Sequence, residues 1–323
     1  MREDKMKVIW CGMGWRNAAK KLELRLKEKI KTLIFIYQDS SIPLDQQVKD
    51  VNALIPTMEI IDKQVMDAAP RLKLIQQFGV GLEGIDIEAA NYRKIFVANA
   101  PGTNKKSVAE TAFYFMLALA KKSNEAHILF QTRKLGVPIG MELAGKILGI
   151  IGFGQSGIEL ARRAIGFEMK VMAIKQKIKP SDIYDFEIDF LGNKNDLDHL
   201  LQNSDYVSIH VPVTFETKDL IGEREFRLMK PTAYIINVSR GPIINKDALH
   251  NALKNKLIAG AGLDVFWNEP ENPEDPLFKE NVVTLPHVAG STIESHDRMI
   301  SVMVENICRL DAGEPILNLK FHK

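Results

Sequence analysis

The sequence predicts an α/β protein of two doubly wound parallel-sheet domains with a cleft between them. Three observations lead to this prediction. The chain has 323 residues, which is long for a single hydrophobic core, so two domains are expected. Short apolar runs alternate with helical patterns along the chain, as in parallel sheets that are covered by helices on both faces. Near the middle, the glycine-rich turn 152–157 joins an apolar run directly to a helical pattern.

Composition and charge argue against several classes of protein. Hydrophobic residues make up 46% of the chain and charged residues 26%, as in an ordinary globular protein, and the net charge is only +2. So small a charge does not indicate nucleic-acid binding, and no uncharged apolar stretch reaches the roughly 18 residues of a membrane span. The two cysteines, Cys11 and Cys308, have no metal-ligand spacing. We therefore expect no metal, disulfide, signal peptide, nucleic-acid partner or membrane partner, and a cytoplasmic location.

The first hundred residues predict a complete small α/β domain. Strands are expected at 7–11, 33–37, 53–56, 72–78 and 95–98, and helices at 17–31 and 62–69. The turn Gly12-Met13-Gly14 resembles the start of a dinucleotide fingerprint, but Asn17 stands where the third glycine belongs. We interpret it as a turn into the following helix.

A second α/β series follows a turn-rich break at 99–104, which we expect to be a hinge. Ser107 and Glu110 have the spacing of a capping box, which predicts a helix over 108–122. Strands are then expected at 147–151, 170–174, 206–210, 234–237, 259–264 and 282–285, and helices near 157–164, 196–203, 223–228, 246–255 and 293–311. Six strands with crossovers are the content of a complete Rossmann domain.

The glycine turn predicts where a dinucleotide binds. Its spacing is Gly152-x-Gly154-x-x-Gly157, placed between a strand and a helix. The first glycine permits the tight turn, the second lets the backbone approach a pyrophosphate, and the third lets helix and strand pack closely. The free N–H groups at the start of the helix then face the phosphates. The spacing alone is a weak signal, and the strand–turn–helix context gives it its meaning.

Polar residues at the carboxyl ends of three later strands are candidates for chemistry. They are Arg240, Glu269 and His287. An arginine matches a carboxylate with two parallel hydrogen bonds, and a histidine exchanges a proton near neutral pH. A carboxylate against the other ring nitrogen orients the imidazole and favours its charged form. Each residue alone has a structural interpretation, and a single histidine at a strand end is more often structural. Their joint occurrence after a dinucleotide fingerprint therefore carries the prediction.

The chain resembles the D-isomer-specific 2-hydroxyacid dehydrogenase family over essentially its whole length. The matching stretches, in order, are Gln77-Phe-Gly-Val-Gly81 with Ile85-Asp86, Asn99-Ala-Pro-Gly, Ser107-Val-Ala-Glu110, the glycine fingerprint, Ser208-Ile-His-Val-Pro-Val-Thr, Asn237-Val-Ser-Arg240-Gly, Asp264-Val-Phe with Glu269-Pro, and Pro286-His287. The resemblance implies a flavodoxin-like substrate domain at 1–102 plus 296–323 and a Rossmann cofactor domain at 103–295. The return of the last helix to the first domain rests on this resemblance as much as on pattern.

The resemblance also implies a role for each site residue. Arg240 binds the substrate carboxylate and carbonyl, His287 is the acid/base, Glu269 pairs with His287, and the backbone amides of Val80 and Gly81 hold the carboxylate. The expected cofactor contacts are Gly152, Gly154, Gln155, Ser156, Gly157, Lys175, His210, Val211, Pro212, Thr217, Val238, Ser239, Arg240, Asp264, His287 and Gly290.

The implied reaction is reversible hydride transfer between NAD(P) and a D-2-hydroxy acid or its 2-oxo acid, with the protein acting as a 2-oxo acid reductase. Arg240 would stabilise the developing alkoxide. The alternative is a nucleotide-sensing binding module of the same fold, similar to corepressors, without turnover. The family's dimer-forming segment corresponds to the helix at 108–122 and the loop before Gly140, so a homodimer is expected, although the helix could equally be internal.

Departures from the family pattern sharpen two expectations. Lys175 stands at the strand end where NAD-preferring relatives carry an acid, which favours NADP over NAD. The alternative is an ordinary solvated basic loop with relaxed cofactor preference. Ser156 and Thr111 are expected to be tolerated packing variants. The loop 54–58 has no basic residue, and with Phe78 and Trp267 it indicates a small or apolar 2-oxo acid. Formate is disfavoured because Glu269 replaces the glutamine of formate dehydrogenases.

Overall fold

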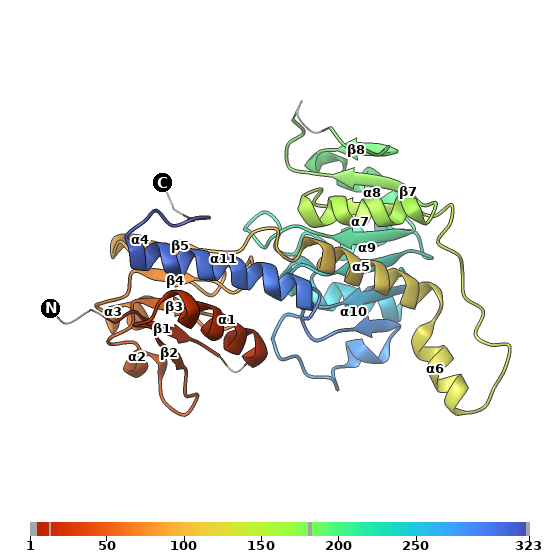
Figure 1. Cartoon of the computed structure of the whole chain (residues 1–323). Coiled ribbons are helices and arrows are strands. Elements are labelled where there is room, and N and C mark those ends of the chain that lie inside the picture. Colours follow the sequence, from red (N-terminus) through yellow and green to blue (C-terminus); the bar gives the residue numbers. More distant parts are fainter. Residues whose placement is uncertain (1–4, 13, 180–182, 321–323) are drawn as a thin grey trace. The chain divides into compact units, whose positions relative to one another are not determined.

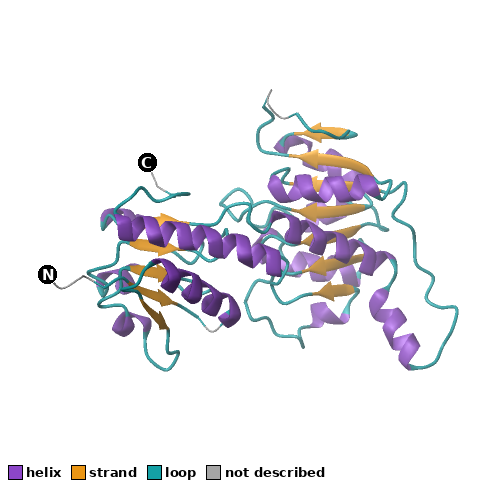
Figure 2. Ribbon diagram, viewed as in Figure 1, coloured by secondary structure: helices purple, strands orange, loops and turns teal. Residues whose placement is uncertain are grey.

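The computed structural model describes residues 5–12, 14–179 and 183–320. The chain divides into two compact units, of which one comprises Met1–Asn104 with Thr292–Lys323 and the other Lys105–Ser291. The boundaries expected from the sequence lie a few residues from these positions. Each unit contains one parallel sheet with helices on both faces, so the predicted fold class is confirmed (Figure 1, Figure 2).

The first unit has a five-stranded sheet in the order β2-β1-β3-β4-β5, which is the flavodoxin-like order. Its strands are β1 (Lys7–Trp10), β2 (Ile34–Tyr37), β3 (Ala53–Ile55), β4 (Leu74–Gln76) and β5 (Phe96–Ala98). Its helices are α1 (Arg16–Lys29), α2 (Leu44–Gln47), α3 (Lys63–Asp67), α4 (Ile87–Tyr92) and α11 (Ile293–Ala312). Helices α1 and α11 cover one face of the sheet, and α3 and α4 cover the other.

Helix α11 carries the carboxyl-terminal part of the chain back to the first unit, where it lies beside α1 (Figure 1). Fully buried Asn306 fixes α11 against the sheet. Its Nδ2 donates to Oε1 of Gln76 on β4 (2.6 Å), and its Oδ1 accepts from the backbone N–H of Leu317 (2.8 Å). The segment after α11 then pairs with β5, where the N–H of Lys320 donates to the carbonyl of Val97 (2.8 Å).

The second unit has a seven-stranded parallel sheet in the order β12-β11-β10-β9-β6-β7-β8. Its strands are β6 (Ile147–Ile151), β7 (Lys170–Ile174), β8 (Phe190–Gly192), β9 (Tyr206–Ile209), β10 (Tyr234–Asn237), β11 (Gly260–Leu263) and β12 (Val282–Thr284). From β8 to β11 this is the Rossmann order, and the order reverses between β6 and β9. Ligands of open α/β sheets bind at the carboxyl ends of strands near such a reversal.

The second sheet is covered by α5 (Lys105–Ala120) and α7 (Gln155–Gly166) on one face. The other face is covered by α8 (Leu197–Asn203), α9 (Glu223–Leu228) and α10 (Lys246–Lys254). Figure 2 shows these helices in purple around the orange strands. Helix α6 (Ser123–Gln131) follows α5 and buries none of its residues in the unit.

The structure corrects several expectations. The capping box at Ser107 is wrong, because α5 begins at Lys105 and Ser107 is buried within it. Glu110 instead forms an ion pair with Arg163 of α7 (2.7 Å). The sheet has a seventh strand, β8, which has only three residues and was not predicted. The helices α2, α4 and α6 were also missed, since each is short and lacks a clear apolar stripe.

The turn after β1 leads into α1, as the interpretation of the Gly12 region requires. Met13 of that turn lies outside the described residues. Trp15 is the residue before the helix and has a left-handed backbone conformation (φ 54°), and Asn17 lies within the first helical turn.

Candidate active site

The glycine turn after β6 has the close packing that its sequence predicts. A Cβ atom on Gly152, whose φ is +99°, would lie 2.7 Å from the carbonyl carbon and oxygen of His210. A Cβ on Gly157 would lie 2.6 Å from the carbonyl oxygen of Gly152. A Cβ on Gly154 would meet no protein atom within 4 Å. The outer two glycines are therefore required by packing, whereas the middle one leaves its surface open, as the approach of a pyrophosphate requires.

The start of α7 offers backbone donors to that surface. Gly154 precedes the helix without a side-chain cap, and the N–H of Ile158 is bonded back to the carbonyl of Gly154 (2.9 Å). The amides of Gln155, Ser156 and Gly157 therefore come before the helical hydrogen-bond ladder. Such amides, together with the positive end of the helix dipole, suit a phosphate group. The residues present thus fit a dinucleotide cofactor.

His210, directly after β9, lies between two serine hydroxyls. Its Nδ1 is 3.0 Å from Oγ of Ser156, and its Nε2 is 2.9 Å from Oγ of Ser208. Burial lowers the pKa of His210 to about 4, so the ring is neutral at pH 7. A neutral imidazole has one donor and one acceptor, so one serine accepts and the other donates. Ser156 is thus more than a packing variant, because its hydroxyl joins the fingerprint turn to β9. Thr111 makes a longer contact, from Oγ1 to the carbonyl of Ala289 (3.4 Å).

Lys175 is the first residue after β7, as predicted. Its backbone N–H donates to the carbonyl of Gly192 (3.1 Å), which continues the pairing of β7 with β8. The segment 175–179 reads Lys-Gln-Lys-Ile-Lys and contains no carboxylate. No acid therefore stands at the strand end where a ribose hydroxyl would be bound.

The remaining predicted cofactor residues belong to loops that are tied to one another. Thr217 donates through Oγ1 to the carbonyl of Pro212 (2.6 Å) and accepts from the N–H of Thr214 (2.7 Å). The hydroxyl of Ser239 donates to the carbonyl of Val211. These bonds hold the loop after β9 against the end of β10. Val238 is buried there, and Gly290 lies in the loop after β12.

The turn that carries Arg240 is closed by Asn237, the last residue of β10. The Asn237 side chain accepts from the N–H of Ser239 (3.1 Å) and donates to the carbonyl of Arg240 (2.8 Å). Gly241 follows, and a Cβ there would lie 2.1 Å from the carbonyl oxygen of Phe266, in the loop after β11. The loops after β10 and β11 are therefore in backbone contact, which brings Arg240 and Glu269 into one region.

His287 and Glu269 form a close pair. Nδ1 of His287 lies 2.6 Å from Oε2 of Glu269, and the other carboxylate oxygen accepts from the N–H of Phe266 (3.0 Å). Partial burial acts to raise the pKa of Glu269, but the hydrogen bonds from His287 and Phe266 and the charges of His287 and Arg240 outweigh it, and the pKa is lowered. Glu269 is therefore a carboxylate at neutral pH and can accept from Nδ1 of His287, which leaves Nε2 for a substrate.

Asp264, at the end of β11, positions the turn that carries His287. Both of its carboxylate oxygens accept backbone hydrogen bonds, one from Val288 (2.8 Å) and one from Ala289 (2.8 Å), and its own carbonyl accepts from the N–H of His287 (2.7 Å). The side chain is 1% exposed. Burial raises its pKa to about 6, against the lowering effect of these backbone bonds. His287 itself has a left-handed backbone conformation (φ 56°).

A group of residues behind the Glu269 loop was not predicted from the sequence. Nζ of Lys246, at the start of α10, lies 2.8 Å from Oδ2 of Asp275 and 3.4 Å from Oε1 of Glu271. It also lies 5.5 Å from the ring centroid of Trp267, whose Nε1 donates to the carbonyl of Ile244 (2.6 Å). These contacts stabilise the loop between β11 and β12. No short sequence motif joins the residues, so only the fold brings them together.

The predicted carboxylate-binding residues Val80 and Gly81 belong to the first unit, after β4, whereas the other predicted site residues belong to the second unit. The side chain of Val80 is 42% exposed, and its carbonyl accepts from Nδ2 of Asn99 (2.7 Å). Phe78 is buried against Trp10 and Trp15, so it contributes to the core of this unit. Asn99 opens one of the stretches that resemble the family, but its contact with Val80 could not be predicted from the sequence.

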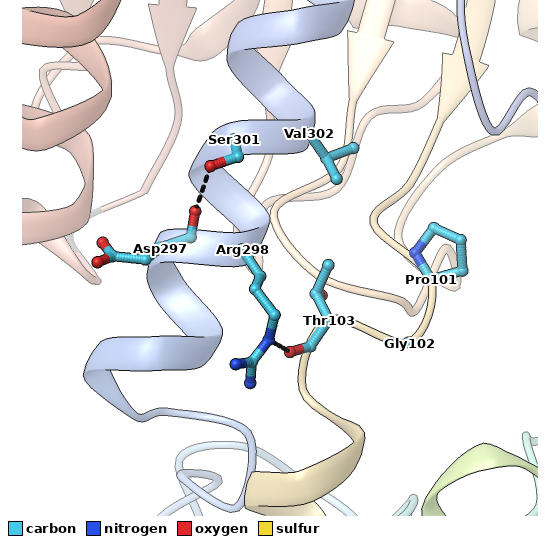
Figure 3. Close-up of a pocket in the computed structure, with 7 residues that line it drawn as sticks. All are labelled: Pro101, Gly102, Thr103, Asp297, Arg298, Ser301 and Val302. Carbon is cyan, nitrogen blue, oxygen red and sulfur yellow. Dashed lines mark hydrogen bonds between the residues drawn. The ribbon is translucent and has the colours of Figure 1, made fainter.

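The first unit also contains an open hollow of about 450 Å³ beside α11. Its lining includes Thr103, whose carbonyl accepts from Nε of Arg298 (2.6 Å), and Ser301, which donates to the carbonyl of Asp297 (2.8 Å; Figure 3). None of the residues predicted to bind substrate or cofactor lines it. Among the described residues, no group of three or more His, Cys, Asp or Glu side chains could hold a metal ion. In the same part of the chain, no helix has the length and apolar character needed to cross a membrane.

Comparison with known proteins agrees with this arrangement. The family description "D-isomer specific 2-hydroxyacid dehydrogenase, NAD binding domain" matches residues 113–289. A glyoxylate reductase of Korarchaeum cryptofilum is 40% identical over 285 residues, covering 85% of this chain and 84% of its own. A glyoxylate reductase of Thermococcus litoralis is 39% identical over 300 residues, covering 88% and 89%.

Solved structures extend the similarity to the whole chain. A Thermus thermophilus protein superposes with a TM-score of 0.86 and 31% identity, covering 97% of this chain and 99% of its own. Two other solved structures that are similar to this chain contain different cofactors, NADP in one and NAD in the other. An NADPH-dependent glyoxylate/hydroxypyruvate reductase from Sinorhizobium meliloti, in complex with NADP and malonate, has a TM-score of 0.84 and 26% identity and covers 98% and 97%. An NAD-dependent formate dehydrogenase from Staphylococcus aureus, in complex with NAD, has a TM-score of 0.84 and 26% identity and covers 98% and 100%.

These matches confirm the family that the sequence motifs indicated, and with it the enzyme class. The chain belongs to the D-isomer specific 2-hydroxyacid dehydrogenase family and is an NAD(P)-dependent oxidoreductase of 2-oxo and 2-hydroxy acids.

Proposed function

We propose that the protein acts as a reductase of small 2-oxo acids, with glyoxylate as its first candidate substrate. The observation that carries the proposal is the His287–Glu269 pair beside the Arg240 turn, at the carboxyl ends of adjacent strands in the sheet that carries the glycine turn. Two relatives at 40% and 39% identity are glyoxylate reductases. The absence of a basic residue in loop 54–58 also favours a small substrate over a phosphorylated one.

Each residue has a chemical task in this proposal. His287, with Nδ1 held by Glu269, donates a proton from Nε2 to the substrate carbonyl oxygen during reduction and recovers it during oxidation. Arg240 binds the carboxylate and stabilises the negative charge that develops on the reacting oxygen. The amides of Val80 and Gly81 bind the same carboxylate. A bound reduced nicotinamide supplies the hydride, and Gly152, Gly154 and the start of α7 hold its pyrophosphate.

A panel of acids tests the proposed substrate class. Glyoxylate, hydroxypyruvate, pyruvate and a branched 2-oxo acid would each be supplied with NADPH and with NADH, and nicotinamide absorbance would be followed. We expect oxidation of the cofactor, with the highest kcat/KM for glyoxylate. A higher kcat/KM for the branched acid would move the substrate assignment to larger side chains. No oxidation with any acid would contradict the proposed function.

We propose NADPH as the preferred cofactor. Lys175 follows β7 at the position where a carboxylate would bind the ribose hydroxyls, and a lysine there attracts a 2′-phosphate. The replacement Lys175→Asp should therefore lower kcat/KM for NADPH and raise it for NADH. Lys177→Asp, at an exposed position two residues further along the chain, is the matched control and should change the ratio less. A wild-type preference for NADH would refute this choice.

We propose that the protein forms a homodimer through α6 and the loop before Gly140. The other expected dimer segment, the helix at 108–122, is largely buried as α5 in the core of its own unit. Helix α6 buries no residue in its own unit, and it and the loop before Gly140 carry exposed large apolar side chains: Ile128 is 59% exposed, Phe130 78%, Leu135 96% and Ile139 82%. Exposed apolar surface of this kind marks sites of association. Sedimentation should give a dimer for the wild type and a monomer for the double variant Ile128→Asp, Phe130→Asp. A wild-type monomer at micromolar concentration would contradict the proposal.

We also propose a cytoplasmic location, because Cys11 and Cys308 are both free thiols, as is usual in a reducing compartment. Cell fractionation with an antibody against the protein tests this, and recovery outside the cytoplasmic fraction would contradict it.

A further inference from the structure

Two consecutive peptide groups after β4 are held by the segment 99–100 through their carbonyl oxygens. The carbonyl of Gly79 accepts from the backbone N–H of Ala100 (2.8 Å). The carbonyl of Val80 accepts from Nδ2 of Asn99 (2.7 Å). Both bonds lie within the first unit, and they tie the loop after β4 to the segment after β5.

These two bonds fix the direction of two amides. In a trans peptide the C=O and N–H groups point in opposite directions, and neither peptide is cis. Because the carbonyls of Gly79 and Val80 face the 99–100 segment, the N–H groups of Val80 and Gly81 face away from it. Within the described chain, neither N–H donates to a protein acceptor. Successive N–H groups that point to one side form a concave donor pair suited to a carboxylate.

The side chain of Asn99 is buried, and only one of its two polar atoms has a hydrogen-bond partner among the described residues. Its side chain is 4% exposed, and its Oδ1 is buried without a hydrogen-bond partner among the described residues. A buried amide oxygen without a partner costs stability, which offsets what the bond from Nδ2 to the Val80 carbonyl contributes. The directional effect of Asn99 is therefore on the orientation of the Val80–Gly81 peptide.

We propose that Asn99 is a positioning residue for substrate binding, which sets the Val80 and Gly81 amides toward the carboxylate of the 2-oxo acid. Its bond to the Val80 carbonyl also polarises that peptide, and this strengthens the Gly81 N–H as a donor. The inference rests on the proposed function, in which those amides bind the carboxylate. Asn99 itself does not touch the reacting atoms.

The test compares Asn99→Asp and Asn99→Ala with a matched control. Asn99→Asp keeps the size but removes the donor and places an acceptor beside the Val80 carbonyl. The control, Asn306→Ala, removes another buried amide of the same unit, whose hydrogen bonds go to Gln76 and Leu317 and not to residues 79–81. The readouts are KM for glyoxylate, KM for NADPH, thermal stability, and calorimetric binding of oxamate, an unreactive carboxylate analogue, to the enzyme with NADPH.

Loss of one oriented donor to a charged group should raise the glyoxylate KM and the oxamate Kd of both Asn99 variants roughly 10- to 100-fold. KM for NADPH should change by less than about twofold, because only carboxylate binding is altered. Asn306→Ala should lower thermal stability and leave both KM values near wild type. Weaker carboxylate binding with unchanged cofactor binding indicates a positioning role, whereas a loss of stability alone indicates a purely structural one.

The proposal is overturned if the Asn99 variants keep wild-type affinity for oxamate, or if they weaken glyoxylate and NADPH binding equally. A wild-type enzyme that reduces no 2-oxo acid would instead defeat the proposed function. Oxamate calorimetry then still decides the role of Asn99, since it requires no turnover. Weaker oxamate binding by Asn99→Asp than by the wild type supports the positioning role. Equal binding by the two proteins, or no binding by either of them, contradicts that role.

Discussion

Nδ1 of His287 lies 2.6 Å from Oε2 of Glu269, and the second oxygen of that carboxylate is held by the N–H of Phe266. The carboxylate is thus fixed by its own loop while it orients the imidazole. Since the pKa of Glu269 is lowered, the pair keeps this arrangement at neutral pH. The imidazole has its other nitrogen left for proton exchange with a substrate.

Replacement of Glu269 by glutamine should impair this orientation. The amide can donate as well as accept, so the tautomer of His287 is no longer fixed, and the charge that stabilises the imidazolium is lost. We expect kcat for glyoxylate reduction to fall about 10- to 100-fold while KM for the cofactor is kept. Steady-state kinetics of Glu269→Gln and Glu269→Asp measure this, and partial recovery with aspartate is expected. Equal activity of glutamine variant and wild type would show that the pair has no role in turnover.

The fingerprint glycines should separate cofactor binding from folding. Gly154→Ala adds a methyl group that meets no protein atom within 4 Å, so the variant should fold normally. Its KM for NADPH should rise about tenfold or more, because the methyl group stands where a pyrophosphate would approach. Gly157→Ala places a methyl group 2.6 Å from the Gly152 carbonyl and should lower thermal stability. Calorimetry and fluorescence titration distinguish the two effects. Unchanged cofactor affinity in Gly154→Ala would show that the dinucleotide lies elsewhere.

Gly241 should prove essential to the geometry of the catalytic loops. A Cβ there would lie 2.1 Å from the carbonyl oxygen of Phe266, so Gly241→Ala must move the Arg240 turn away from the loop that carries Glu269. We expect stability to fall by about 1–3 kcal/mol and kcat/KM to fall more than about 100-fold. Gly166→Ala, at the end of α7 with no atom within 4 Å of the added methyl group, is the control and should be neutral or slightly stabilising. Equal stability and equal kcat/KM of Gly241→Ala and Gly166→Ala would contradict the close contact of Gly241 with the Phe266 carbonyl.

His210 should make stability depend on pH. Its pKa is lowered to about 4 in the folded protein, so between that value and its ordinary 6.5 the unfolded chain binds a proton that the folded protein does not. Stability is therefore present above pH 6.5 and is lost as the pH falls toward 4. From pH 7 to pH 5 the loss should be about 2 kcal/mol.

Urea unfolding of His210→Gln measures this contribution, since the variant should lose correspondingly less stability over the same pH range than the wild type. His199→Gln, at an exposed position, is the control, and its free energy of unfolding should depend on pH as in the wild type. If the free energy of unfolding of His210→Gln also keeps the wild-type pH dependence, the His210 ring is not held neutral by its surroundings.

The strands of the second sheet could be predicted almost residue by residue from the sequence. The strands β6, β7 and β10 are continuous apolar runs because parallel strands are buried on both faces, and such runs have clear ends. β8 could not be found in this way, since it is a short strand at the edge of the sheet. The helix start at Ser107 was misplaced because a capping motif of two residues occurs by chance inside a helix as readily as before one.

The candidate site could be predicted only where a motif carries it. Arg240, Glu269 and His287 follow strands and stand beside glycine or proline, which makes them visible in the sequence. The contacts of Asn99 with Val80, of Lys246 with Asp275 and of Ser156 with His210 cannot be seen there, because each depends on how a loop turns toward a residue far away in the chain. Lys175 could be located from the strand that it follows.

The central claim is that His287 exchanges the proton in 2-oxo acid reduction, and single-turnover reduction of glyoxylate by NADPH with wild type and His287→Ala tests it most directly. We expect the rate to fall about 10²- to 10⁴-fold in the variant, as for loss of a general acid, while NADPH still binds with wild-type affinity. A near-normal rate in His287→Ala with intact cofactor binding would contradict the account.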